Sequence, residues 1–205
     1  DTGYLGNNPS PRNPNGKKIT HRIVKNALQN LHMPDRDAEG SDKHYGSGRW
    51  NSLGIQLKDW YPGSKILIVP PSQKVMKYFE QDLDIWIEET VKTLKMHTKR
   101  PIKIRKKPSR EDRVSINTLE QELANDVHCL VTYNSIAALE AMVYGKPAIV
   151  LGPNCAQDVC EKSLSRVEFA EHPGRKSLTY LCRYLSNNQF TYEEMLSGYA
   201  WSVLK

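Results

Sequence analysis

The sequence lacks any apolar run of about 20 residues, the length that a membrane-spanning helix needs. Its most apolar stretch, residues 136–151, is interrupted by Glu140, Gly145, Lys146 and Pro147. The start of the chain also lacks the basic and apolar regions of a secretory signal peptide. We therefore expect a soluble, cytoplasmic protein without membrane insertion.

Cysteine is scarce too, with four residues in 205. Cys155 and Cys160 are five positions apart, a spacing that fits neither a redox-active CxxC pair nor a usual zinc site. We expect reduced, mostly buried thiols, because free cysteine behaves as a small apolar residue. The histidines form no metal-spacing cluster, and the chain has no Walker loop, GxGxxG, HExxH or GxSxG motif. The sequence thus gives no support for a metal ion or a bound cofactor.

The net charge of +6 comes from one segment. Between Lys99 and Arg113, eight basic residues stand against Glu111 and Asp112. Removing these from the totals of 29 basic and 23 acidic residues leaves 21 of each, so the rest of the chain is neutral. Such a cluster suits a polyanion or a phosphate group, although a solvated strand end has the same composition. Its basic members are Lys99, Arg100, Lys103, Arg105, Lys106, Lys107, Arg110 and Arg113.

The chain divides into two parts by composition. Residues 1–60 are rich in Gly, Asn and Pro and predict an irregular, loop-rich segment, in which 21–33 forms a short helix or a strand with a turn. This part is too polar to build a core alone, so it packs onto another part or is the remnant of a further domain. Residues 61–205 have the patterning of a folded domain.

Within 61–205, short apolar runs alternate with helical patterns, which is typical of an α/β fold with a parallel sheet and flanking helices. The expected strands are 65–71, 101–105, 128–133 and 147–152, and the expected helices are 82–96, 118–124, 134–144, 178–185 and 192–204.

Several local signals refine this prediction. Asp82 is placed to cap a helix in which Ile85, Trp86 and Leu94 face the core. The pair Thr118 and Gln121 has capping-box spacing. We predict a Rossmann-like sheet.

Ligands of open α/β sheets bind beyond the carboxyl ends of the strands. Thr132, Tyr133, Asn134 and Ser135 follow one strand and open a helix, whose free N–H groups attract phosphate. Capping of the helix by Asn134 or Ser135 accounts for these residues equally well.

Two further strand ends carry suitable residues. Arg105 and Lys107 follow the strand at 101–105 and could bind a diphosphate. Gly152 and Pro153 follow the last strand, where glycine allows a ligand to come close or simply forms a turn.

Glu140 could bind a ribose hydroxyl or pair with Lys146. We interpret His128 as a core histidine rather than a catalytic one. No residue is identified as the catalytic base.

Residues 131–153, VTYNSIAALEAMVYGKPAIVLGP, resemble the donor-binding half of glycosyltransferases with the two-domain B-type (GT-B) fold. The resemblance is strongest to capsule polysaccharide (Kdo-type) transferases and to glycosyltransferase-like proteins of phages and proteobacteria. Pieces of similar sequence extend over most of the chain, at residues 1–6, 22–29, 66–72, 98–109, 119–124, 163–168 and 188–201.

This resemblance implies transfer of a sugar from a nucleotide sugar without a bound metal. Thr132, Asn134 and Ser135 would hold the donor diphosphate, Arg105 and Lys107 would neutralise it, and Glu140 would contact the ribose. The acceptor half of such enzymes is missing here, with Asp1 and Tyr4 as its possible trace. A second chain or a missing amino-terminal domain would then supply it. The acceptor is a surface glycan or modified phage DNA, the latter placing the protein in the host cytoplasm.

Two other functions compete. A nucleic-acid-binding module without catalysis would use residues 99–113 on the phosphate backbone, but it leaves the segment 135–147 unexplained. A sugar-nucleotide epimerase would need a paired acid and base, which the sequence does not offer.

Overall fold

The computed structural model describes residues 3–6, 20–24, 27–33, 46–107 and 118–204. Asp1, Arg110 and Arg113 lie outside these ranges. The chain forms two compact units, one made of 57–178 and the other of 1–56 together with 179–205. The division into domains at residue 60, with 61–205 as one nucleotide-sugar-binding domain, stays a prediction.

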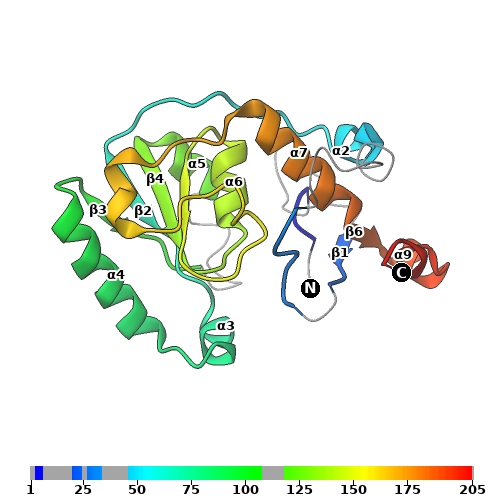
Figure 1. Ribbon diagram of the computed structural model, residues 1–205, viewed down its shortest axis with the longest axis horizontal. Helices are drawn as coiled ribbons and strands as arrows, with labels where there is room; N and C mark the ends of the chain where they lie inside the picture. Colours follow the sequence, from blue (N-terminus) through cyan, green and yellow to red (C-terminus); the bar gives the residue numbers. More distant parts are fainter. Residues whose placement is uncertain (1–2, 7–19, 25–26, 34–45, 108–117, 205) are drawn as a thin grey trace. The chain divides into compact units, whose positions relative to one another are not determined.

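A four-stranded parallel sheet forms the centre of the larger unit (Figure 1). Its strands are β2 (Lys65–Ile68), β3 (Ile102–Ile104), β4 (Val127–Thr132) and β5 (Ala148–Val150), in the order β3-β2-β4-β5. All three pairings are parallel. The predicted α/β fold with a Rossmann-like parallel sheet is therefore confirmed.

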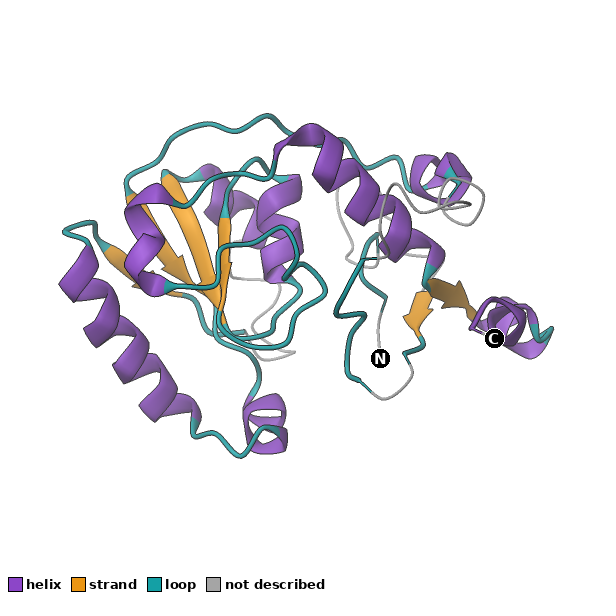
Figure 2. Cartoon of the chain, in the orientation of Figure 1, coloured by secondary structure: helices purple, strands orange, loops and turns teal. Residues whose placement is uncertain are grey.

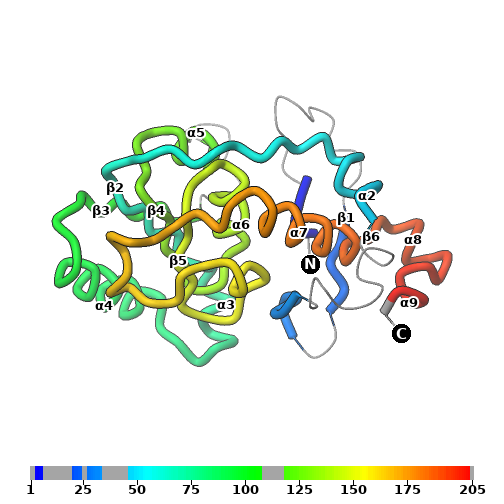
Figure 3. Tube along the Cα trace, turned by 45° about the horizontal axis from the view of Figure 1, so that its top comes forward, coloured from blue at the N-terminus to red at the C-terminus, as the bar shows by residue number. Residues whose placement is uncertain are grey.

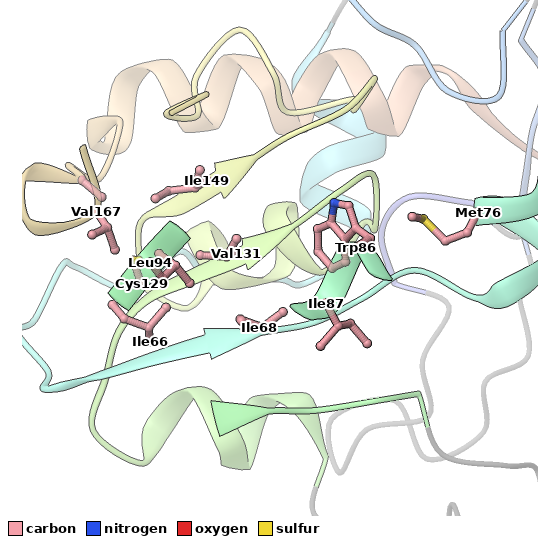
Figure 4. Packing of buried hydrophobic residues seen from close by; sticks show 11 residues of the cluster. Ile66, Ile68, Met76, Trp86, Ile87, Leu94, Cys129, Val131, Ile149 and Val167 are labelled. Carbon is pink, nitrogen blue, oxygen red and sulfur yellow. The ribbon is translucent and has the colours of Figure 1, made fainter. Parts of the chain in front are cut away.

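Alternation of side chains along the strands gives the sheet two buried faces. On one face, Ile66, Cys129, Val131 and Ile149 are fully buried in one apolar cluster (Figure 4). Leu67 and Leu130, the alternate residues, are also buried, at 1% and 0% exposure. Strands covered on both sides have continuous apolar sequences, which is why the sequence revealed them.

Helices cover the two faces (Figure 2). The cluster of Figure 4 receives side chains from α3 (Gln73–Tyr78), α4 (Leu83–His97) and the 3₁₀ helix η2 (Leu164–Phe169). The helices α5 (Leu119–Ala124) and α6 (Ala137–Val143) pack against β4, and α6 also packs against β5. The unit is thus an α/β/α sandwich.

The helix starts follow the predicted caps. Asp82 accepts hydrogen bonds from the backbone N–H groups of Asp84 and Ile85, and Thr118 forms the expected capping box with Gln121. Trp86 and Leu94 face the core as predicted. The prediction for Ile85 was wrong, because its side chain is 57% exposed.

The segment before β2 is bound tightly to the amino edge of the sheet. The N–H of Lys58 donates to the carbonyl of Val143 at 2.9 Å. Gly145 ends α6 with φ +76°, and a Cβ there would lie 2.2 Å from the Asp59 carbonyl oxygen. Glycine is therefore required at position 145 by both its conformation and its neighbour.

Lys146 is the largest fully buried side chain of the described residues. Its Nζ donates to the carbonyl oxygens of Tyr61 and Pro62 at 2.9 and 3.3 Å, and lies 3.2 Å from the centroid of the Tyr61 ring. Burial lowers the pKa of Lys146 to about 8, although Asp126 counteracts this effect. The lysine thus fixes the segment before β2 to the start of β5.

The smaller unit contains the antiparallel pair of β1 (Thr20–Arg22) and β6 (Gln189–Thr191), which lie side by side in Figures 1 and 3. Its helices are α2 (Ser47–Ser52), α8 (Tyr192–Leu196), α9 (Tyr199–Leu204) and most of α7 (Gly174–Asn187). The helix expected over 192–204 is interrupted between α8 and α9.

Tyr4 belongs to the core of this unit. Its side chain is 2% exposed and its hydroxyl donates to Asn30 Oδ1 at 2.7 Å. Gln189 Oε1 accepts from the N–H groups of Tyr4 and Leu5 at 2.8 and 2.9 Å. The opening segment is therefore held to β6.

We expect Lys146→Met to lower the free energy of unfolding at neutral pH by about 1–3 kcal/mol, because the buried lysine's two hydrogen bonds to the carbonyls of Tyr61 and Pro62 are lost. The loss should grow between about pH 8 and about pH 10.5. In that window the unfolded chain binds the Lys146 proton and the folded chain does not, so the lysine's contribution to stability rises with pH.

Urea unfolding at several pH values measures this difference. Lys92→Met, which replaces an exposed lysine of α4, is the control and should change stability little at any pH. A difference between wild type and Lys146→Met that falls as the pH rises would contradict our account of Lys146.

Candidate functional site

The strand order places a topological switch point between β2 and β4. From β2 the chain continues to β3 on one side, and from β4 it continues to β5 on the other. The loops after β2 and β4 therefore leave the sheet in opposite directions. In open α/β sheets the crevice between such loops is the usual ligand site.

Backbone hydrogen bonds align the four strands at this carboxyl edge. The N–H of Arg105 donates to the Ile68 carbonyl at 2.8 Å, and Val69 donates to Val131 at 2.8 Å. On the other side of β4, Gly152 donates to the Tyr133 carbonyl at 2.9 Å. The three loops that carry the predicted site residues thus begin at the same edge of the sheet, with β2 between β3 and β4.

The turn after β4 is built by its own hydroxyl groups. Thr132, fully buried at the end of β4, accepts from the N–H of Ser135 at 3.3 Å. Ser135 Oγ accepts from the N–H of Ala137 at 3.2 Å, and α6 begins at Ala137 rather than at Asn134 as predicted. Asn134 is also buried, at 5% exposure. The half-buried Ser135 hydroxyl keeps its proton available for a ligand.

Asn154 joins the turn after β4 to the loop after β5. It is fully buried; Nδ2 donates to the Ser135 carbonyl at 3.0 Å and Oδ1 accepts from the N–H of Ala156 at 2.9 Å. From the sequence, Asn154 stands out only as part of a turn after Gly152 and Pro153. A polar amide directly behind a strand-ending Gly-Pro pair is the signal that could have identified it.

The Tyr133 ring forms one wall of the site. It lies edge-on to the rings of Phe79 and Trp86, at centroid distances of 5.4 and 6.3 Å. A Cβ at Gly152 would lie 2.6 Å from atoms of the Tyr133 ring, so glycine is needed there for the ring to fit. Gly152 therefore shapes the site through Tyr133, and Pro153 beside it is exposed.

The described members of the basic segment, up to Lys107, are distributed along β3 and do not form one patch. Arg100, at the amino end, pairs with Glu168 at 2.9 Å, and Lys103 pairs with Glu122 at 2.6 Å. Lys106 pairs with Asp84 at 3.1 Å. Arg105, which is half-buried, and the exposed Lys107 are the members that follow β3 at the carboxyl edge, which they share with the turn after β4.

Asp82 and Asp84 form an acidic pair that the sequence alone does not mark as a site. Asp82 caps α4, while Asp84 holds Lys106. Over the described ranges, no three His, Cys, Asp or Glu side chains gather closely enough to hold a metal ion.

Two remaining predictions concern Glu140 and His128. The ammonium of Lys146 binds the carbonyls of Tyr61 and Pro62, which removes the expected role of Lys146 as partner of Glu140. Glu140 is half-buried on α6. His128 Nε2 lies 3.0 Å from the Val167 carbonyl, and burial lowers the pKa of this imidazole.

The cysteines are all free thiols, three buried and Cys160 partly so. Burial raises the pKa of Cys129 to about 12 and raises the pKa of Cys160 as well. A thiol with a raised pKa is a poor nucleophile at neutral pH. The expectation of mostly buried cysteines is therefore confirmed.

We expect Asn154→Ala to lower the free energy of unfolding by about 1–3 kcal/mol, because the buried N–H of Ala156 and the Ser135 carbonyl lose their partner. Asn125→Ala, at an exposed asparagine of the same unit, should stay within about 0.5 kcal/mol of wild type. Urea unfolding followed by circular dichroism gives both values. Equal stability of the two variants would show that Asn154 does not hold the loops together.

None of the helices in the described ranges combines the length and the apolar character that crossing a bilayer requires. No protein-family model matches the sequence, and no curated protein matches it. Among solved structures, the chain is similar to the β-Kdo 2,4 transferase KpsC of Thermosulfurimonas dismutans, with a TM-score of 0.42 and 11% sequence identity. The match covers 88% of this chain and 71% of that one. At these values the likeness carries no argument, and the fold assignment rests on the sheet itself.

Proposed function

We propose that this chain is the donor-binding part of a glycosyltransferase that acts in the cytoplasm on a nucleotide sugar. The observation that supports the proposal is that Arg105 after β3 and the Ser135 turn after β4 both lie at the carboxyl edge of one parallel sheet, with only β2 between their strands. The resemblance of residues 131–153 to the donor half of B-type enzymes supports it. A nucleotide diphosphate or monophosphate needs the combination found here, a cation beside polar donors at the carboxyl edge.

Each residue of the site has a proposed role. Arg105 and Lys107 bind the donor phosphate, and the Ser135 hydroxyl donates a hydrogen bond to it. Thr132 and Asn134, both buried, shape the turn that presents Ser135. This division rests on exposure, because a fully buried hydroxyl cannot reach a ligand without rearrangement.

The remaining residues bind the nucleoside. Tyr133, whose ring fits beside Gly152, provides a wall for the base or sugar, and the exposed Pro153 contacts the ligand at the end of β5. Glu140 accepts a hydrogen bond from a ribose hydroxyl.

These roles define the reaction. A hydroxyl of the acceptor attacks the anomeric carbon of the donor sugar, and the bond from that carbon to the phosphate oxygen breaks. The nucleotide leaves with the bonding electrons, and a base takes the proton of the attacking hydroxyl. Arg105 and Lys107 stabilise the negative charge that develops on the leaving phosphate. With these cations in place, we propose that no metal is needed.

The acceptor is proposed to be a polymer with free hydroxyl groups, either a surface glycan or hydroxyl-modified phage DNA. The acceptor-binding surface and the base would come from a second chain or from a further domain, because we assign the role of base to no side chain of the carboxyl edge.

Non-catalytic binding of nucleic acid by residues 99–113 is the competing function. The ion pairs of Arg100, Lys103 and Lys106 weigh against it, because three of the cations that would contact phosphates are already neutralised. Their spread along β3 also leaves no continuous basic surface among the described residues.

The test is calorimetric titration with UDP, GDP, CMP and their sugars. We expect one nucleotide family to bind, and Arg105→Ala to weaken that binding by about tenfold, the loss of one charge-assisted hydrogen bond.

Lys99→Ala is the matched control, because it removes an exposed cation of the same segment at the opposite end of β3. It should leave nucleotide affinity unchanged. Absence of binding by every nucleotide, together with salt-dependent binding of duplex DNA, would favour the competing function.

A further inference from the structure

A concave site lies at the opposite edge of the same sheet. It is a hollow of about 620 Å³, within the range of small-molecule sites. Its walls come from residues 57–60 before β2, from 168–175 after η2, and from His128 near the amino end of β4. None of these residues belongs to the carboxyl-edge site.

Two large aromatic side chains line this hollow. Trp60 is 54% exposed and Phe169 is 67% exposed. Arg166 lies over the Phe169 ring, with its guanidinium carbon 5.9 Å from the centroid. Exposed aromatic rings that meet in a concavity are characteristic of binding sites.

The charged groups of the hollow are largely compensated. Arg175 pairs with Asp59 at 2.7 Å, and Glu168 is held by Arg100 at 2.9 Å. The Lys58 ammonium lies 4.2 Å from the Tyr144 ring centroid and 4.0 Å from Glu120. With its cations engaged and Glu171 exposed, the lining does not suit a phosphate or another anion.

Two histidines line the hollow. Both ring nitrogens of His172 are already hydrogen-bonded, whereas His128 has a nitrogen that can accept a hydrogen bond. His172 donates from Nε2 to the Met142 carbonyl at 2.7 Å and accepts at Nδ1 from Gly174 at 3.3 Å. His128 donates from Nε2 to the Val167 carbonyl. Burial lowers the pKa of His128, so at neutral pH its Nδ1 is a hydrogen-bond acceptor, and no described residue donates to it.

We propose that this hollow binds a neutral carbohydrate, with the apolar face of a sugar ring on Trp60 and a hydroxyl donating to His128 Nδ1. A sugar matches the lining because its CH groups pack on an aromatic face while its hydroxyls bond the polar side chains around it. Glu171 accepts from a further hydroxyl. The proposal does not depend on glycosyltransferase activity, because it rests on different residues at the other edge of the sheet.

The test is NMR titration of the full chain with maltotriose, cellotriose and triacetylchitotriose, following the indole N–H signals of the four tryptophans. We expect at least one of these sugars to shift the Trp60 signal in a saturable way. Trp60→Phe identifies that signal by its loss. Trp60→Ala and His128→Ala should each weaken binding of that sugar by about tenfold, measured from its own saturation-transfer signals.

Trp201→Ala is the matched control, since Trp201 is similarly exposed at 66% but lies outside the hollow. The Trp201→Ala variant should bind the sugar as wild type does. If Trp60→Ala does not fold, Phe169→Ala provides a second test of the hollow.

UDP should leave the Trp60 signal unmoved. No shift with any of the three sugars, an equal shift with UDP, or unchanged affinity in Trp60→Ala would each overturn the proposal. Nucleotide binding at the carboxyl edge is measured separately by calorimetry, so either site can fail without the other.

Discussion

The parallel pairing of β2 with β4 is the constraint on which the larger unit depends. Ile66 lies opposite Cys129 and Ile68 opposite Val131, so the side chains of both strands enter the same apolar cluster. If the register of a strand shifted by one residue, these side chains would point to the other face of the sheet. Leu67 or Leu130 would then take their place in the cluster. The same register decides which loops meet at the carboxyl edge, so core packing and site geometry are fixed by one set of hydrogen bonds.

The two edges of this sheet differ in chemistry because different segments flank the strands at each end. At the carboxyl edge, the polar turn at 132–135 follows β4 and Arg105 follows β3. At the amino edge, the segment 57–63 contacts Gly145 and the buried Lys146, and Asp59 pairs with Arg175. The two edges of one sheet therefore carry different sets of polar side chains.

The sequence predicted the features that depend on local patterning. Continuous apolar runs identify strands buried on both faces, and the caps at Asp82 and Thr118 lie within three residues of their partners. It could not predict which cations of residues 99–113 are neutralised, because Glu168 and Glu122 reach them only through the fold. The role of Asn154 could not be predicted for the same reason, since Ser135, to whose carbonyl it donates, is 19 residues away.

The apolar pattern of α4 gave a wrong prediction for Ile85. This side chain lies on the solvent side at the start of the helix, whereas Trp86 and Ile87 face the core. The helix α6 starts three residues later than predicted, and the Ser135 hydroxyl accepts from the N–H of Ala137 at its start. Helix ends are the part of an element that residue spacing defines least well.

The pairing of β1 with β6 has a consequence for how the chain folds during synthesis. Thr20 lies opposite Thr191, so the first strand has no partner until residue 191 has left the ribosome. The segment 57–178 is continuous and has all its strands within reach much earlier. Domains generally fold as units while translation proceeds, and closing a long loop is the slow step. The unit of residues 57–178 should therefore fold first. The strand β1 should pair only later, once β6 has been synthesised.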